Sequence, residues 1–565
     1  MRLAEPPQGH YRLAVKRGSD RDPILEFDYI IVGAGSAGCV LAARLTEDAN
    51  IRVLVLEAGP MDTDPMIKIP LTWARMFHDR RHDWGYDFEP EQATGGRAIE
   101  CARGRVVGGC SSVNAMAYVR GNRGDYQRWS RNDLAAWDYA HALPYFKRAE
   151  SWEKGGDDYR GGDGPLRVTE ARFNDPLIDA YYRAAHAAGY KENEDFNGAD
   201  QFGFGRSQQT TRAGYRESAA TAYLHPARRR PNLTLRTKAL VTGIMFEGNR
   251  ATGIFYQAGG AAHEAHAAAE VILAGGVINS PQLLMLAGIG EADALRAHDI
   301  EVRADLPGVG KNLQDHISAG AVYARKGSSP FVRQMRYDRL AIDMPLAYLF
   351  GKGPATQYPV GPHGYMKLDA DAEAPDIQVL FGAGPMDAHP WFPGIRKAFN
   401  NAFSARAVLL HPKSRGEVKL ASGDPARKMR LISNFLSEPD DLDTLRQGLE
   451  RVRALLMRPE LDEFRGAELL PGPEATDAAA LEAHIRSTCI TVHHPLGTCR
   501  MGSDAEAVVD GELRVTGAEN LRVVDASVMP DMVSGNINAA VIMIAEKAAD
   551  MILGRPPLEP APVGG

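Results

Sequence analysis

Three glycines and one glutamate near the start of the chain have the spacing of a dinucleotide-binding turn. The apolar run 27–32 leads into Gly33-x-Gly35-x-x-Gly38, and a helical pattern of small and apolar residues follows at once. Glycines at these places permit a tight turn, close approach of the backbone to a pyrophosphate, and close packing of the helix on the strand. The free N–H groups at the start of that helix attract phosphate. The motif therefore predicts a dinucleotide site.

The glutamate narrows the class of cofactor. A second apolar strand pattern, 52–56, ends at Glu57, 22 residues beyond Gly35. A carboxylate about 20 residues beyond the glycines accepts hydrogen bonds from ribose hydroxyls. Glu57 would repel a 2′-phosphate, which favours an adenosine cofactor without that phosphate. The turn alone does not distinguish FAD from NAD.

Bulk properties exclude several other classes of protein. The chain has 565 residues, 44% of them apolar, and a net charge of only −7. Its length predicts two domains, and the absence of a long basic run argues against nucleic acid or an anionic membrane as partner. We expect no metal site. No apolar run approaches the roughly 20 residues of a spanning helix.

Five cysteines in so long a chain form no disulfide framework, which favours a reducing compartment. Residues 1–25 contain charges and a tandem proline but no apolar core, so they do not resemble a secretory signal. We therefore expect a cytoplasmic protein with an N-terminal arm at 1–25. The proline-rich tail 556–565 is predicted to be disordered.

The pattern along the chain predicts the fold class. Strand patterns at 27–32, 52–56, 270–274 and 520–525 belong with helices at 39–45, 280–287 and 538–553 in an α/β domain of Rossmann type. Another helix is predicted at 175–190, and two strands flank the turn Gly248-Asn249. The stretch 326–500, rich in aromatic residues and Met, reads as an antiparallel sheet with helices.

The cofactor domain is therefore predicted to be discontinuous. We assign 26–165, 206–325 and 515–555 to a Rossmann-like FAD-binding domain, and 166–205 with 326–514 to an antiparallel-sheet substrate domain. The class is α/β, or α+β overall. The choice of FAD in this assignment depends on a family resemblance.

Five motifs, in order along the chain, resemble those of the glucose–methanol–choline (GMC) oxidoreductases, a family of FAD-dependent alcohol dehydrogenases and oxidases. They are the opening turn with Glu57, the glycine-rich loop 104–118, the segment 279–290 with its continuation 306–316, the run 493–502, and the stretch 523–538. The chain departs from the family pattern at Cys110, where Ser, Thr or Gly is commoner, and at Ala287, where Ser is usual. The resemblance implies an enzyme that oxidises the CH–OH group of a small-molecule alcohol.

The resemblance assigns the chemistry to His494 and Asn536. In the family, the histidine directly before the proline of the fourth motif is the active-site residue, and a second His or an Asn lies opposite it. Histidine suits a base that takes the hydroxyl proton while flavin N5 accepts the hydride. Asn536 would orient the alcohol. It also stands at the entry to the last helix, whose positive dipole end would lie near the flavin pyrimidine.

The resemblance also implies which residues hold FAD. The opening turn and Glu57 would contact the ADP half, the glycine-rich loop the ribitol and flavin, the backbone of Val241 the adenine, and the start of the fifth motif the pyrophosphate or ribitol. The implied residues are Gly33, Gly35, Ser36, Ala37, Gly38, Glu57, Val107, Gly108, Asn114, Ala115, Met116, Ala117, Val241, Asp525, Ala526, Asn536 and Ile537.

Cys101 bears on how FAD is attached. Some family members attach FAD covalently through a His just before the glycine-rich loop, and Cys101 lies near that place. Because free Cys usually behaves as a small buried hydrophobe, we expect non-covalent FAD.

The proline after His494 bears on the neighbouring His493. The residue before a proline favours an extended conformation, in which Val492 and His494 share a face and His493 points away. His493 is therefore predicted to be structural.

The substrate is the least determined part. Choline enzymes of the family carry a carboxylate two residues after the His of their Gln-Asp-His motif, and this chain has Ser318 there. We therefore expect a primary alcohol, apolar or aromatic, that is oxidised to the aldehyde. Choline dehydrogenation remains an alternative, as does the hydroxynitrile lyase or photodecarboxylase chemistry of this scaffold. The sequence leaves open whether O2, a quinone or a dye accepts the electrons, and leaves the oligomeric state open.

Overall fold

The first of two large sheets has a parallel centre. In the computed structural model, which describes residues 26–131 and 133–562, five parallel strands run in the order β11-β2-β1-β14-β25. Strands β13 and β12 continue the sheet from β14 in antiparallel pairing. Their bounds are β1 Glu26–Val32, β2 Val53–Glu57, β11 Leu233–Thr237, β12 Ala239–Glu247, β13 Arg250–Ala258, β14 Ala261–Leu273 and β25 Leu521–Val523.

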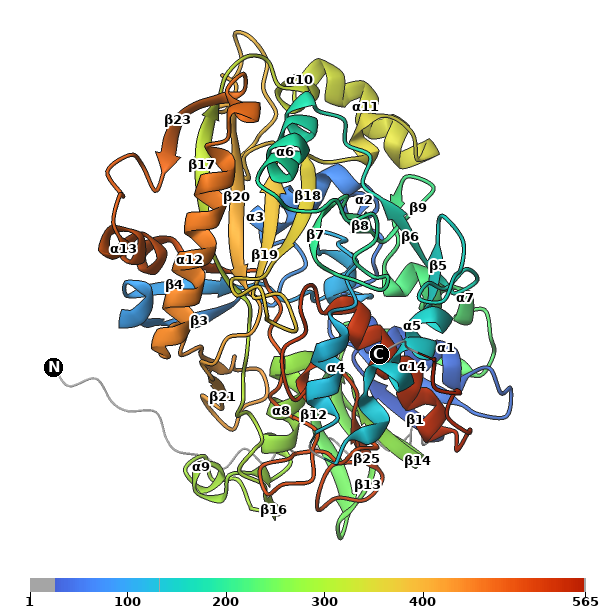
Figure 1. The fold of residues 1–565 in the computed structure, drawn as a ribbon. Coiled ribbons are helices and arrows are strands. Elements are labelled where there is room, and N and C mark those ends of the chain that lie inside the picture. The colour runs from blue at the N-terminus through green and yellow to red at the C-terminus, as the bar shows by residue number, and fades with distance from the viewer. Residues whose placement is uncertain (1–25, 132, 563–565) are drawn as a thin grey trace, which may run out of the picture.

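Helices cover this sheet in the lower half of Figure 1. Helix α14 (Asn538–Ile552) contacts both α1 (Ser36–Leu45) and α5 (Tyr139–Ala149), and nearly all its residues are buried. Helix α1 lies directly on β1 because Gly38 has no side chain. A Cβ at Gly38 would lie 1.9 Å from the carbonyl oxygen of Gly33. Helix α8 (Gly276–Leu286) follows β14.

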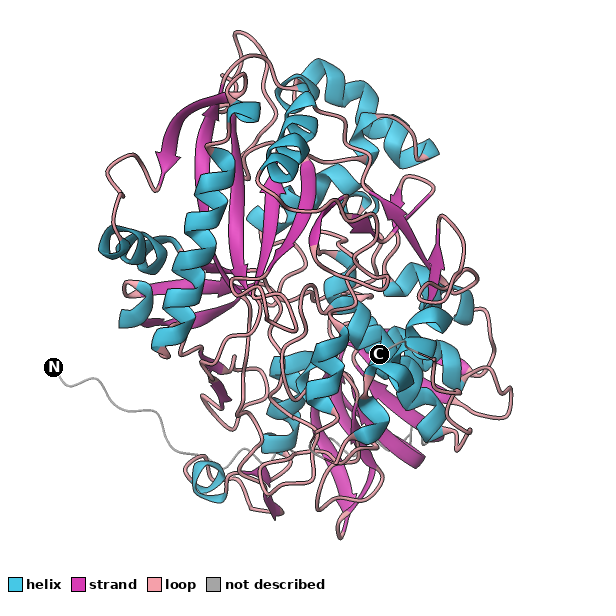
Figure 2. Cartoon of the chain, viewed as in Figure 1, coloured by secondary structure: helices cyan, strands magenta, loops and turns pink. Residues whose placement is uncertain are grey.

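The second large sheet is antiparallel and lies in the upper half of Figure 1. Its order is β23-β17-β20-β19-β18-β7, and β24 pairs with β17. Figure 2 shows helices on one face of this sheet. Helix α12 (Pro439–Leu456) packs there through apolar residues at helical spacing, including Leu445, Leu449 and Val452. The strands are β7 Gly203–Gly205, β17 Ile317–Arg325, β18 Val360–Met366, β19 Ile377–Gly382, β20 Ala402–Leu409, β23 Arg465–Leu470 and β24 Ile490–Thr491.

Smaller elements connect the two sheets. The further helices are α2 Pro65–Lys68, α3 Trp73–His78, α4 Arg123–Trp129, α6 Pro176–Ala187, α7 His225–Ala227, α9 Ala292–Arg296, α10 Pro330–Gln334, α11 Tyr337–Phe350 and α13 Ala478–Thr488. The further strands are β3 Tyr86–Glu91, β4 Arg97–Cys101, β5 Glu150–Trp152, β6 Leu166–Glu170, β8 Gln208–Gln209, β9 Thr211–Arg212, β10 Tyr215–Arg216, β15 Ile289–Gly290, β16 Ala304–Asp305, β21 Glu417–Lys419 and β22 Arg430–Ile432.

The mixed fold class predicted from the sequence is confirmed, with helices and sheets in both halves. Two details differ from the predictions. Strand β17 belongs to the second sheet, although the predicted boundary grouped residues up to 325 with the first. The tail was predicted to be disordered from residue 556, but Leu558 N donates to Tyr145 Oη (3.2 Å) and Ala561 N to the Ala140 carbonyl (2.9 Å).

The reason for the second difference is apolar packing, since Leu558 and Ala561 rest on the main core. The predicted arm 1–25 and the last three residues lie outside the described residues. Within residues 26–131 and 133–562, no helix combines the length and the apolar character needed to cross a membrane. All five cysteines are free thiols.

Candidate active site

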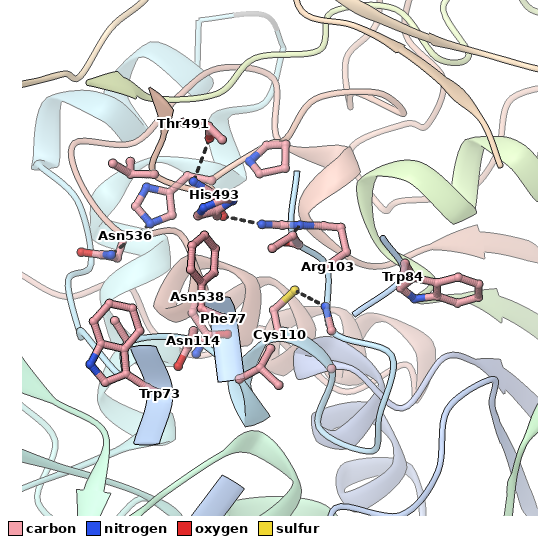
Figure 3. Close-up of a pocket in the computed structure, with 18 of the residues that line it drawn as sticks. Trp73, Phe77, Trp84, Arg103, Cys110, Asn114, Thr491, His493, Asn536 and Asn538 are labelled. Atoms are coloured by element: carbon pink, nitrogen blue, oxygen red, sulfur yellow. Dashed lines mark hydrogen bonds between the residues drawn. The ribbon is translucent and has the colours of Figure 1, made fainter. Parts of the chain in front are cut away.

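A cavity of about 1040 Å³ lies between the two sheets. One side is formed by the ends of β1 and β2 and by the loops after β14 and β25, and the other by residues of β17, β18, β19 and β20. Ligands of parallel α/β sheets bind outside the carboxyl ends of the strands. The position of the cavity therefore fits a dinucleotide on the first side and a substrate on the second. Figure 3 shows residues that line it.

The dinucleotide side contains the opening turn and Glu57. The Glu57 carboxylate accepts from Ala34 N (2.9 Å) and from Gly59 N (2.7 Å). Burial raises the pKa of Glu57 to about 7, while these two amide donors oppose the shift. Each carboxylate oxygen keeps a second lone pair, which can accept from a ribose hydroxyl.

The N-terminus of α1 is free for a phosphate. Gly35 is the N-cap of this helix and no side chain caps it, while Gly35 itself lines the cavity. The glycine-rich loop lies against the same turn, because a Cβ at Gly109 would be 2.8 Å from the Cα of Gly35. The side chain of Ser36 turns to α14 and donates to Asn538 Oδ1 at 2.6 Å.

The structure places most of the implied cofactor residues on the cavity wall. Those that line it are Gly33, Gly35, Ser36, Ala37, Glu57, Asn114, Ala115, Ala117, Val241, Asp525, Ala526, Asn536 and Ile537. Four others, Gly38, Val107, Gly108 and Met116, do not border it. Asp525 Oδ2 is occupied by Gly276 N (2.8 Å) and Ser280 Oγ (2.6 Å), so this side chain fixes the start of α8.

The two cysteines near the glycine-rich loop differ in position. Cys110 lines the cavity, and its Sγ accepts from Gly104 N at 3.4 Å (Figure 3). Cys101 is buried and does not border the cavity, and burial raises the pKa of its thiol above the usual range. Cys101 is therefore a packed thiol in the described structure, with neither the access nor the ionisation that nucleophilic attachment requires.

His494 stands at the end of a chain of hydrogen bonds that determines which ring nitrogen carries the proton. His316 Nε2 lies 3.0 Å from the Leu410 carbonyl, so it must donate its proton there. Burial lowers the pKa of His316 to about 3, so the neutral ring accepts at Nδ1. His494 Nδ1, 2.9 Å from His316 Nδ1, is then the donor, and His494 Nε2 carries a lone pair.

That lone pair accepts from Asn536 Nδ2 at 3.0 Å. Both residues line the cavity, and Asn536 Oδ1 is buried without a hydrogen-bond partner among the described residues. Burial, helped by His316, His493 and Arg103, lowers the pKa of His494 well below its usual value. The ring is therefore neutral at ordinary pH and can accept a proton at Nε2.

Asp315 holds the backbone of His494. Its Oδ1 accepts from His494 N at 2.8 Å, and its Oδ2 accepts from the Thr491 hydroxyl. Thr491 Oγ1 in turn accepts from His493 N at 2.8 Å. Sequence reasoning recognised the motif that contains Asp315 and His316 but assigned neither residue a role. The signal was their position within that motif, and only the fold brings His316 into contact with His494, 178 positions away.

The predicted conformation of the His493-His494 pair is wrong. His493 has a left-handed backbone (φ 65°), so the run is not extended, and Val492, His493 and His494 all line the cavity. The hydrogen bond from His493 N to Thr491 Oγ1 closes this turn (Figure 3). The His493 ring lies 4.9 Å from the Phe77 ring, and its buried Nδ1 has no partner in the described residues.

The residues present fit a bound FAD. The uncapped start of α1 and the lone pairs of Glu57 suit a diphosphate and a ribose, and the unpartnered polar atoms of Asn536 and His493 suit a polar ring at the other end. A dinucleotide-binding sheet, a cavity wall from a second sheet and a neutral histidine facing that cavity are together typical of a dinucleotide-dependent oxidoreductase.

Comparison with known proteins gives the family. Residues 27–318 and 412–545 match the N- and C-terminal regions of GMC oxidoreductases. The chain belongs to the GMC oxidoreductase family. The resemblance inferred from the sequence is thereby confirmed, as are FAD as cofactor and oxidoreductase chemistry on alcohols.

Relatives include two choline dehydrogenases and two oxidases of known structure. The mitochondrial choline dehydrogenase of Homo sapiens is 43% identical over 97% of this chain and 93% of that protein. An oxygen-dependent choline dehydrogenase of Pseudomonas aeruginosa is 42% identical over 94% of this chain and 96% of that protein. Pyridoxine 4-oxidase from Mesorbium loti has a TM-score of 0.83 at 36% identity, covering 93% of this chain and 98% of that one. The structure of a formate oxidase has a TM-score of 0.83 at 25% identity, covering 94% of this chain and 98% of that one.

Proposed function

We propose that this enzyme oxidises a primary alcohol to the aldehyde, with His494 as the base. The observation that carries the proposal is the lone pair on His494 Nε2, which the carbonyl of Leu410 imposes through His316. A base must be unprotonated when substrate binds, and the lowered pKa of His494 keeps it so. FAD, when bound, supplies the hydride acceptor at flavin N5.

Asn536 orients the substrate hydroxyl in this proposal. Its amide Nδ2 already donates into the space that an alcohol oxygen would occupy beside His494 Nε2. An amide donor stabilises negative charge that develops on the oxygen as the proton leaves, and it does not compete for that proton. The unpartnered Oδ1 of Asn536 remains available to the cofactor or substrate.

Choline is a second candidate substrate, favoured by the 43% identity with a choline dehydrogenase. The residues that line the cavity argue against choline. Among the described residues, the acidic ones that line the cavity are Glu57, Asp387 and Asp525. Glu57 ends β2 and Asp525 follows β25, both on the dinucleotide side, and Asp387 is exposed on a loop. The second sheet offers Ser318 where the choline enzymes have a carboxylate. A trimethylammonium group would therefore lack a charged partner beside His494.

The proposed role of His494 is tested by its replacement. His494→Ala should slow anaerobic flavin bleaching by alcohol by about two to four orders of magnitude, because a base of this kind contributes about 10²- to 10⁴-fold. FAD content should remain near that of the unaltered enzyme. The matched control is His186→Ala, on the exposed side of α6. Unaltered bleaching in the His494 variant would refute the role.

The substrate class and the electron acceptor are read in one experiment. The holoenzyme is bleached anaerobically with aryl, furanic and aliphatic alcohols, an amino acid-derived alcohol and choline, and air is then admitted. Rapid return of the yellow colour identifies an oxidase, and slow return favours a quinone or dye acceptor. Bleaching by choline alone would replace the proposed substrate class by the second candidate.

Non-covalent attachment of FAD is part of the proposal, supported by the packed position of Cys101. Acid precipitation should leave the yellow colour in the supernatant. Colour in the protein pellet would contradict it.

A further inference from the structure

One charged side chain on the substrate side of the cavity has no part in the reaction proposed above. Arg406 lies on β20, opposite Gly320 of β17, and lines the cavity. Ala402, Ser404 and Arg406, which share one face of β20, line the cavity together with Phe403. The guanidinium is thus built into the wall of the second sheet.

Two hydrogen bonds hold the guanidinium in place. Its Nε donates to Ser318 Oγ and its Nη2 to the Ser318 carbonyl, both at 3.1 Å. Ser318 Oγ in turn donates to the Ile490 carbonyl at 3.1 Å. These contacts use two of the five N–H groups of an arginine. The remaining three are on Nη1 and Nη2, whose parallel N–H bonds match the two oxygens of a carboxylate.

No carboxylate among the described residues pairs with Arg406. Burial lowers the pKa of the Arg406 guanidinium to about 10, and the group that opposes this shift is the thiol of Cys489 rather than an acid. Arg325, a buried arginine, pairs with Asp175 at 2.6 Å. Arg216 is buried without a carboxylate, but it donates to the carbonyls of Ile67, Ser111 and Asn114 and to Asn114 Oδ1. Arg406 has neither kind of compensation beyond Ser318, and a half-buried cation without a counterion is costly unless a ligand supplies one.

The surrounding sheet makes room for this side chain. A Cβ on Gly320 would lie 2.8 Å from Cγ of Arg406, so the arginine stem rests on a glycine. Ser318 is two residues from His316 along the start of β17, a separation of about 7 Å in an extended strand. His316 contacts His494 directly. Arg406 is therefore held at the same end of β17 as the histidine that contacts the proposed base, and Arg406 and His494 line one cavity.

We propose that Arg406 binds the anionic group of the substrate, and that the substrate is an alcohol carrying a carboxylate at the end away from its carbinol. This inference rests on the function proposed above and specifies its substrate class. It replaces the apolar alcohol expected from the sequence by a hydroxy acid whose middle is apolar. It also explains why Ser318 stands where a choline enzyme has an acid, because a carboxylate there would neutralise Arg406.

A purely structural role for Arg406 makes a different prediction. The guanidinium could serve only to join β17 to β24 through Ser318 and Ile490. Its loss would then lower stability and slow all substrates alike. A binding role instead changes the ratio between an acid and its neutral counterpart, and lysine partly restores that ratio.

The test uses the FAD-loaded enzyme and two matched alcohols, 4-(hydroxymethyl)benzoate and 4-(hydroxymethyl)benzamide. We expect kcat/KM for the acid to exceed that for the amide by at least about 10-fold, since leaving a buried charge unpaired is penalised strongly. In Arg406→Gln the ratio should fall to about one. Arg406→Lys should retain part of the preference. Arg396→Gln, which removes the same charge from an exposed loop residue outside the cavity, should behave as the unaltered enzyme.

A binding measurement separates this inference from the proposed reaction. Calorimetry with 4-methylbenzoate, which has no hydroxyl to oxidise, should show binding to the unaltered enzyme and at least about 10-fold weaker binding to Arg406→Gln. If alcohols do not bleach the flavin but the carboxylate binds through Arg406, the proposed reaction fails and the inference stands. If neutral alcohols are oxidised as well as the acid, or Arg406→Gln keeps the preference, the inference is overturned and the proposed reaction stands.

Discussion

His494 is a case in which a neighbour, rather than the residue itself, determines the chemistry. A histidine in isolation can carry its proton on either ring nitrogen. Here the Leu410 carbonyl accepts only, so the neutral His316 ring must accept at Nδ1 and His494 must donate to it. The ring nitrogen that faces Asn536, His494 Nε2, is consequently a hydrogen-bond acceptor before substrate arrives.

Replacing His316 should therefore alter the rate without touching the substrate. His316→Ala removes the acceptor of His494 Nδ1 and frees the other tautomer, so we expect flavin reduction to slow by about 10- to 100-fold, as for loss of other groups that orient a functional histidine. His316→Gln should recover much of this, because a glutamine can donate to Leu410 and accept from His494. Stopped-flow reduction across pH provides the measurement. Equal losses in the two variants would argue that His316 only fills space.

At the scale of elements, close approach between backbones decides the geometry of the cofactor side. Helix α1 lies on β1, and the loop around Gly109 lies on the turn before α1. Neither contact leaves room for a side chain, so the glycines of the two motifs act together. Gly38 does not border the cavity, and its contribution to cofactor binding is the position of α1.

Gly38→Ala should demonstrate this indirect effect. The added methyl would lie 1.9 Å from the Gly33 carbonyl, so α1 must move away from β1. We expect a loss of stability of about 1–3 kcal/mol, as for other overpacked sites, together with a lower FAD content. Thermal unfolding and the flavin-to-protein absorbance ratio measure the two effects.

Gly243→Ala is the matched control for this change, since a methyl there would meet Phe255 at 3.6 Å, an ordinary contact. It should leave both quantities nearly unaltered. A Gly38→Ala protein with full FAD content would show that α1 tolerates the displacement.

At the scale of the whole molecule, the active site exists because two sheets of different kinds share one cavity. The parallel sheet contributes the cofactor side, and the antiparallel sheet contributes the wall that contains Arg406 and His363. Closing such a cavity buries ionisable groups. Burial lowers the pKa of His363 to about 4, that of His316 to about 3 and that of His493 to about 3.

These histidines should make the enzyme less stable in mild acid. Their folded-state pKa values are below the unfolded value of about 6.5, so below that pH the unfolded chain binds more protons. Stability contributed by the neutral rings is complete above about pH 6.5 and is lost as pH falls to about 4 for His363 and to about 3 for His316 and His493. His363 alone accounts for up to about 1.4 kcal/mol per pH unit in this window.

His363→Leu tests the size of this effect at one position outside the proposed base. Urea unfolding at saturating FAD, at pH 7 and pH 5, should show a smaller acid destabilisation in the variant than in the unaltered enzyme. Parallel losses in the two proteins would mean that His363 titrates normally in the folded state.

Local patterns were sufficient for much of the fold. The turn at Gly33, the strands 52–56 and 270–274, and the hairpin around Gly248-Asn249 follow from hydrophobic periodicity and glycine placement, which depend on near neighbours. Local rules failed at His493, whose left-handed backbone, closed by a hydrogen bond to Thr491, interrupts the extended run predicted from the proline after His494. They failed also for the tail, where Leu558 finds an apolar surface that composition does not reveal.

The sequence by itself determined the family, the cofactor and the identities of His494 and Asn536 as candidate residues. It could do so because each of the five motifs is a short run of consecutive residues. Only the tertiary structure decided which nitrogen of His494 is free, since that depends on His316 and the Leu410 carbonyl. The fold likewise decided that Arg406 faces the cavity with no counterion in the described part of the chain. Hydrogen bonding and charge compensation act through space between segments far apart in the chain, and no local pattern encodes them.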